Sequence, residues 1–215
     1  QAAIAGVKHF IFISSTKVNG EETSETLEPF CETDVPLPED EYAHSKLAAE
    51  NHLKTICHAS NMAYTIIRPP LVYGPGVKGN FEKLIKLVGK GVPLPFAKMQ
   101  NWRSVLAIDN LTDFIWTCIE KPKAKNETFL IADKDDVSTT GLLIAISEAY
   151  KKSLRLFYIP KTPLRWLLAC IGKKNIYRKL YSCLIVRKDK AKVLLGWEPI
   201  SDLPSQLRKM VEREK

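Results

Sequence analysis

Long hydrophobic runs, paired cysteines and metal-ligand clusters are all missing from this sequence. The most apolar stretch, residues 164–171, contains Arg165 and is far shorter than the roughly 20 residues of a membrane-spanning helix, so no span is predicted. The 5 cysteines lack CxxC spacing and the 4 histidines lack ligand spacing, which argues against a disulfide framework and a metal site. Unpaired cysteines are typical of reduced thiols, and we therefore expect a cytoplasmic protein.

Acidic residues are scarce in one long segment. Residues 151–192 contain 13 lysines and arginines but a single acid, Asp189, and the whole chain has a net charge of +8. A basic segment attracts phosphates, which makes nucleic-acid binding one hypothesis. However, its bases alternate with apolar residues, as on the solvated faces of amphipathic elements, and a phosphorylated small substrate would explain the charge equally well. We expect no nucleic-acid partner.

Short apolar runs alternate with helical patterns along the chain. The apolar runs predict buried strands at residues 10–14, 64–68, 104–108, 128–132 and 154–159. The helical patterns predict helices at residues 40–58, 80–89, 109–120 and 138–151, with Asn61 as a stop and Asp109 and Ser138 as caps. This alternation favours an α/β fold whose parallel sheet is joined by crossover helices.

The segment Tyr42-Ala-His-Ser-Lys46 carries the clearest chemical signal. On a helix, residues i and i+4 share one face, so the phenol and the ammonium project together. A free tyrosine, with a pKa near 10, is a poor base at neutral pH, whereas a nearby cation stabilises the phenolate. Such a pair can take a proton from a hydroxyl group. The pair alone is also compatible with a solvated surface contact.

Two further motifs flank this helix. A strand that ends in Ser14, Ser15 and Thr16 precedes it, and Arg68-Pro-Pro-Leu-Val-Tyr-Gly-Pro-Gly76 follows it. In this order the motifs resemble the extended short-chain dehydrogenase/reductase family, the NAD-dependent epimerase/dehydratase group. The likeness runs to Leu195-Gly-Trp-Glu-Pro199, near the end of the chain. It implies the C-terminal part of a doubly wound, Rossmann-type parallel sheet with a small substrate-binding region.

The resemblance implies a role for each matching residue at the reacting centre. Ser15 matches the residue that hydrogen-bonds the reacting sugar oxygen, and Tyr42 matches the acid/base. Lys46 matches the lysine that also holds the nicotinamide ribose, so Tyr42 and Lys46 count as cofactor-binding as well. Pro69 and the backbone around Val72 match the segment that lies against the nicotinamide. The cofactor implied is NAD or NADP.

The resemblance also implies a nucleotide-sugar site. Asn80 and Phe81 match the pair that opens the helix gripping the nucleotide diphosphate, where a helix N-terminus suits an anion. Phe96 belongs to a stretch that flanks the base, and Arg103 matches the arginine that clamps phosphate. Thr16 joins these substrate-binding residues. From the residues alone, Asn80 could be a simple cap, Phe96 a core residue and Arg103 a surface arginine.

Two departures from the family pattern limit the reaction. Family dehydratases carry an Asp-Glu pair after the hydroxyl residue, where this chain has Thr16 and Lys17. Neither can replace a carboxylic acid, so dehydration is not expected. The glycine-rich dinucleotide fingerprint is also absent from these residues. We therefore expect the chain to belong to a longer protein and to be inactive by itself.

The resemblance is strongest to bacterial enzymes described as UDP-glucose 4-epimerases. It implies NAD(P)-dependent hydride transfer at a sugar carbon, C4 of a UDP-hexose or a UDP-N-acetylhexosamine, by a homodimer. Residues 1–76 would belong to the catalytic domain and residues 77–215 mostly to the substrate-binding region. Two alternatives stay open: an NAD(P)H-dependent reductase of 4-keto-sugar nucleotides, and a non-catalytic nucleotide-binding regulator.

Overall fold

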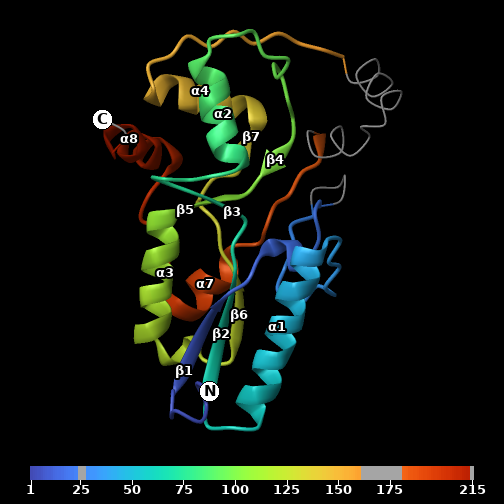
Figure 1. Ribbon diagram of the computed structural model, residues 1–215, viewed down its shortest axis with the longest axis vertical. Coiled ribbons are helices and arrows are strands. Elements are labelled where there is room, and N and C mark those ends of the chain that lie inside the picture. Colours follow the sequence, from blue (N-terminus) through green and yellow to red (C-terminus); the bar gives the residue numbers. More distant parts are fainter. Residues whose placement is uncertain (24–27, 161–180, 214–215) are drawn as a thin grey trace.

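A parallel sheet of three strands forms the centre of one half of the molecule (Figure 1). The computed structural model describes residues 1–23, 28–160 and 181–213. The strand order is β1 (His9–Ile13), β2 (Ala63–Arg68) and β6 (Glu127–Leu130), with β2 in the middle. Parallel strands need crossover connections, and helices supply them here. The predicted α/β class with a parallel sheet is therefore confirmed.

Helices cover both faces of this sheet. Helix α1 (Glu41–His58) lies on one side, and α3 (Ile108–Glu120) and α7 (Asp189–Leu195) lie on the other (Figure 1). Side chains of β2 alternate between the faces, because successive residues of a strand point in opposite directions. Tyr64 and Ile66 pack with residues of α1. Ile67 packs with Phe129 and with residues of α3 and α7.

A buried ion pair ties α1 to the end of β2. Arg68 donates from Nε to Glu50 Oε1 (2.9 Å) and from Nη2 to Glu50 Oε2 (2.6 Å). Its Nη1 donates to Asn19 Oδ1 (3.0 Å), so three segments meet at one guanidinium. All three residues are at least 97% buried. Paired and hydrogen-bonded charges of this kind fix one geometry, because any other would leave a buried charge without compensation.

The other half of the molecule is built on two small sheets. Strands β3 (Leu71–Tyr73) and β5 (Val105–Ala107) pair in parallel, and β4 (Trp102–Arg103) pairs antiparallel with β7 (Val137–Ser138). Helices α2 (Asn80–Gly89), α4 (Thr139–Ala149) and α8 (Leu203–Arg213) surround them (Figure 1). The helices bury a second apolar core, which includes Phe81, Leu143, Ile146 and Leu207. Two short 3-10 helices, η1 (Thr16–Val18) and η2 (Pro122–Ala124), complete the elements of the described residues.

Three local predictions are wrong. Asp109 does not cap α3: the cap is Ala107, because the helix begins directly after β5, and Asp109 lies in its first turn. Helix α1 ends at His58 with Ala59 as its cap, before Asn61. Residues 154–159 form no strand but a single bridge between Leu94 and Leu156. Beyond this bridge the backbone N–H of Ala97 donates to the carbonyl of Phe157 (3.2 Å), one residue later than a regular parallel ladder requires, so the bridge does not extend into a strand.

Some sequence features lie outside the described residues. These are the apolar stretch at residues 164–171 and the middle of the basic segment, residues 161–180. In the part of the chain that the structure describes, no helix is long and apolar enough to cross a membrane.

Candidate active site

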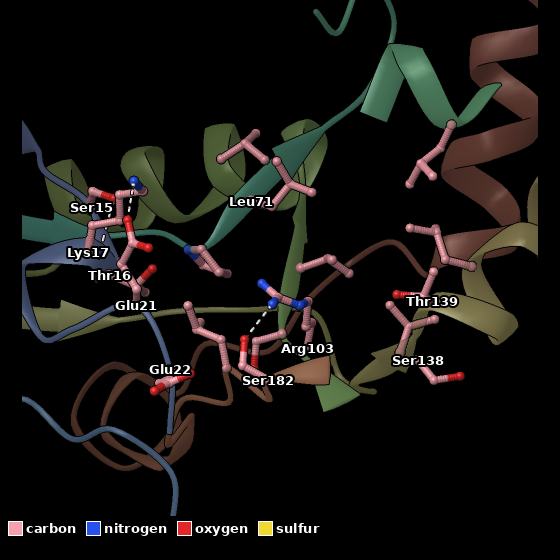
Figure 2. Close-up of a pocket in the computed structure, with 18 of the residues that line it drawn as sticks. Ser15, Thr16, Lys17, Glu21, Glu22, Leu71, Arg103, Ser138, Thr139 and Ser182 are labelled. Carbon is pink, nitrogen blue, oxygen red and sulfur yellow. Dashed lines mark hydrogen bonds and ion pairs between the residues drawn. The ribbon is translucent and has the colours of Figure 1, made fainter. Parts of the chain in front are cut away.

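A pocket of about 740 Å³ lies between the two halves of the molecule. It is lined by the residues that follow β1, by the start of α1, by the segment from Pro70 to Val72, and by β4, β7 and the start of α4. Figure 2 shows Ser15, Thr16 and Lys17 at one end, Ser138 and Thr139 at the other, and Arg103 between them. Its volume is in the range of pockets that hold small-molecule ligands.

Ser15 stands where β1 passes into the 3-10 helix η1. It is the N-cap of that helix, and its Oγ accepts a hydrogen bond from the backbone N–H of Lys17 (3.2 Å). A hydroxyl that accepts in this way keeps its own hydrogen for a donor bond. Ser15 also lines the pocket. It can therefore donate a hydrogen bond to an oxygen of a bound molecule.

Tyr42 and Lys46 lie on successive turns of α1, as the i, i+4 spacing predicts. Tyr42 lines the pocket and is 52% exposed. Lys46 Nζ lies 5.7 Å from the centre of the Tyr42 ring and donates to the backbone carbonyl of Ile13 (2.9 Å). Ile13 ends β1, two residues before Ser15. The structure thus brings Ser15 and Tyr42 into one pocket and places Lys46 beside Tyr42, although Lys46 is not among the lining residues.

The ends of β1 and β2 lie side by side at the pocket. The backbone N–H of Thr16 donates to the carbonyl of Pro69 (3.0 Å). Thr16, Pro70 and Val72 line the pocket, whereas Pro69 is not among the lining residues. The predicted segment therefore does border the site, with Pro70 rather than Pro69 at its surface.

Helix α2 begins at Asn80, as predicted, after Gly79, whose positive φ (79°) favours glycine. The ring of Phe81 is fully buried and stacks on Tyr73, with 5.2 Å between the ring centres. Its side chain therefore belongs to the core, and α2 contributes Lys83 and Leu84 to the pocket wall instead.

Phe96 and Arg103 both line the pocket. Arg103 belongs to β4, and its Nη2 donates to Ser182 Oγ (2.9 Å). Burial lowers the pKa of the Arg103 guanidinium, while nearby negative groups, among them Glu21 and Glu22, oppose this shift. The ordinary pKa of an arginine lies so far above neutral pH that the guanidinium stays protonated there despite this shift. The pocket thus holds a half-buried cation near its middle, suited to a phosphate.

Several lining residues had no signal in the sequence. Lys83, Thr139 and Ser182 reach the pocket only because distant segments fold together. Ser138 had a signal, but for a different role: it is the predicted N-cap of α4, and its Oγ accepts from the N–H of Gly141 (3.0 Å). No local spacing rule joins residue 182 to residue 103, so such neighbours cannot be read from one sequence.

A serine after a parallel strand, with a tyrosine and a lysine on successive turns of the next helix, is the arrangement expected of a dehydrogenase-like enzyme, and the comparison with known families agrees. Residues 1–132 match the NAD dependent epimerase/dehydratase family. The chain belongs to this family, and the recognition made from its motifs is confirmed.

Individual relatives make the likeness more specific. The chain is 45% identical over 200 residues to a UDP-glucose 4-epimerase of Vibrio cholerae, a match that covers 93% of this chain and 61% of the relative. A solved structure of UDP-glucose 4-epimerase from Thermotoga maritima matches with a TM-score of 0.74 at 24% identity, over 98% of this chain and 64% of that one. UDP-glucuronic acid 4-epimerase of Bacillus cereus matches with a TM-score of 0.76 at 20% identity, over 100% and 65% of the two chains. These structural matches show the fold alone, and the chain spans less than two thirds of each relative.

Proposed function

We propose that the protein is a nucleotide-sugar epimerase that inverts C4 of a UDP-hexose or a UDP-N-acetylhexosamine with NAD or NADP. The observation that carries this proposal is the position of Ser15 and Tyr42 in one pocket, with Lys46 beside Tyr42. The similarity to the Vibrio cholerae UDP-glucose 4-epimerase supports this substrate class. The proposed homodimer, cytoplasmic location and boundary after residue 76 rest on the family resemblance alone.

The chemistry of the donor groups fits the nicotinamide end of such a cofactor. The Lys46 ammonium and the Tyr42 hydroxyl suit the hydroxyls of a ribose, and the segment around Val72 would lie against the nicotinamide. Near them, the buried Ser14 hydroxyl has no hydrogen-bond partner among the described residues. When bound, the cofactor would accept a hydride from the sugar carbon and return it. The glycine-rich turn that would bind its pyrophosphate is not within these 215 residues.

Tyr42 would act as the acid/base at the sugar hydroxyl. Its phenolate takes the proton of the C4 hydroxyl as the hydride leaves the same carbon, and its phenol returns that proton after the keto sugar has turned over. Lys46 stabilises the phenolate through its positive charge. Ser15 donates a hydrogen bond to the reacting oxygen. Its hydroxyl hydrogen is available for this bond, because Ser15 Oγ acts as the acceptor toward the N–H of Lys17.

The remaining predicted residues would hold the nucleotide. Arg103 would clamp the diphosphate by paired hydrogen bonds, a task that suits a planar guanidinium. Thr16 borders the sugar, and Phe96 would flank the base. Asn80 and Phe81 open α2 toward the diphosphate, and the buried ring of Phe81 leaves only its backbone for this task.

The cofactor that accompanies the purified protein tests this proposal. An epimerase regenerates its cofactor in each cycle, so the full-length gene product should retain NAD through purification. An empty site that takes up NAD(P)H for each turnover would indicate the 4-keto-sugar reductase instead. Failure to bind any dinucleotide would contradict both and favour the regulator.

A further inference from the structure

Lys17 stands where family dehydratases carry an acid, and the proposed mechanism gives it no role. Its side chain does not extend freely into the pocket. Lys17 Nζ pairs with Glu21 Oε1 (2.9 Å) and, at closer range, with Asp40 Oδ2. Figure 2 shows the Lys17 side chain at one end of the pocket, near Ser15 and Glu21. Because its ammonium group is already paired with two carboxylates, Lys17 is poorly placed to bind an anionic substrate.

The backbone of Lys17 holds one reacting group. Its N–H donates to Ser15 Oγ at 3.2 Å, within the 3-10 turn that Ser15 caps. This bond fixes the direction of the Ser15 oxygen and leaves its hydrogen for a ligand. The position of Ser15 therefore depends on where the backbone of residue 17 lies.

The side chain of Lys17 holds the element that carries the other reacting group. Asp40 is the N-cap of α1, and its Oδ1 accepts from the N–H of Ala43 (2.7 Å). Its second oxygen pairs with Lys17, so a single carboxylate joins the first turn of α1 to η1. Tyr42 lies in that first turn. A shift of the Lys17–Asp40 pair would therefore move Tyr42 relative to Ser15.

The electrostatic surroundings of Lys17 and Asp40 agree with a tight pair. Burial tends to lower the pKa of Lys17, but its hydrogen bonds to Asp40 and Glu21 outweigh this and raise it. The hydrogen bond from Lys17 lowers the pKa of Asp40, with a smaller contribution from the N–H of Ala43. Both groups are thus held in their charged forms at neutral pH.

We propose that Lys17 is a positioning residue that holds Tyr42 at a working distance from Ser15 through Asp40. This inference rests on the proposed function, because it assigns Lys17 a place in the same reaction. It predicts that the loss of the Lys17 cation lowers turnover and leaves the affinity for the nucleotide sugar unchanged.

Kinetics of the full-length gene product with a UDP-sugar test the inference. Lys17→Met should lower kcat by about 10- to 100-fold at an almost unchanged KM, since small displacements of reacting groups have effects of this size. Lys17→Arg should restore most of kcat because it keeps the cation. Asp40→Asn keeps an oxygen for the N–H of Ala43 but loses the charge, and it should match Lys17→Met. The double variant should be no slower than either single variant, since the two residues act as one pair.

Hydrogen exchange gives a second readout that does not need turnover. Amides of the first turn of α1 should exchange faster in Lys17→Met, and those in the rest of α1 should not. Lys192→Met, which removes an exposed ion pair with Glu198 (2.6 Å), is the matched control and should change neither measurement. A kcat within experimental error of the wild type, or a raised KM at unchanged kcat, would overturn the inference. If the wild type converts no UDP-sugar, the proposed function fails. Unchanged amide exchange in Lys17→Met would separately refute the proposal that Lys17 positions the first turn of α1.

Discussion

The hydroxyl of Tyr42 is the group on which the proposed chemistry depends most. Tyr42→Phe removes it with little change in shape and should lower kcat by about 100- to 10,000-fold, the usual contribution of a positioned acid/base. Nucleotide-sugar affinity should survive, because Arg103 and α2 are untouched. Steady-state kinetics and calorimetry on the full-length gene product would measure both quantities. Turnover equal to that of the wild type would remove Tyr42 from the mechanism.

Arg103 should contribute mainly to binding. Arg103→Ala should weaken UDP-sugar binding by about 1.5–3 kcal/mol, the typical value of hydrogen bonds to a charged group. Arg103→Lys keeps the charge but loses the parallel pair of N–H donors. The UDP-sugar affinity of this variant should therefore lie between that of the wild type and that of Arg103→Ala. Calorimetry would show this order. An unchanged affinity in Arg103→Ala would show that Arg103 has no part in substrate binding.

The sequence predicts single residues well where one element sets their geometry. The i, i+4 spacing was enough to place Tyr42 and Lys46 on successive turns of one helix. It could not show that the Lys46 ammonium binds the carbonyl of Ile13, because that contact crosses from helix to sheet. Nor could it show that Lys17 is neutralised by Asp40, which is 23 residues away in the chain.

At the scale of elements, the orientation of α1 depends on the buried pair between Glu50 and Arg68. Glu50→Gln leaves the guanidinium buried without its counter-charge and should destabilise the protein by about 3–5 kcal/mol, as removal of one partner of a buried pair does. Glu50→Gln combined with Arg68→Met removes both charges and should recover part of this loss. Urea unfolding measures both effects.

A matched control lies on the surface. Glu82→Gln breaks an exposed ion pair with Lys86 on α2, which should not measurably change the unfolding midpoint, since solvent screens such pairs. Equal effects of the changes at Glu50 and Glu82 would show that the buried pair does not hold α1.

The sequence predicts a helix or strand well where residues close in the chain determine its ends. Ser138 caps its helix as expected, because its side-chain oxygen accepts from a backbone N–H only three residues further along the chain. The expected strand at residues 154–159 failed because its pairing depends on a distant segment, that of Leu94, with which it keeps register at a single bridge. The Glu50–Arg68 pair was also out of reach, since it joins α1 to β2 through tertiary packing.

At the scale of the whole molecule, strand β1 is the edge of the described sheet. It pairs with β2 on one side, and Phe10 is 38% exposed. Because the glycine-rich turn is not within these residues, we predict that the 215-residue chain alone binds NAD weakly or not at all, and far less tightly than the full-length gene product. Calorimetric titration of both proteins would compare them. Tight NAD binding by this chain as a monomer would refute that prediction.

The conversion of a UDP-sugar into its C4 epimer tests the central claim most directly. The full-length gene product would be incubated with UDP-glucose and with UDP-N-acetylglucosamine, and in separate reactions with the C4 epimer of each. Proton NMR of the anomeric signals follows the composition over time. The account predicts that at least one pair reaches the same ratio from both directions, with no net consumption of NAD or NADPH. Protein that binds the cofactor but leaves every sugar unchanged, or turns over only while NAD(P)H is consumed, would contradict it.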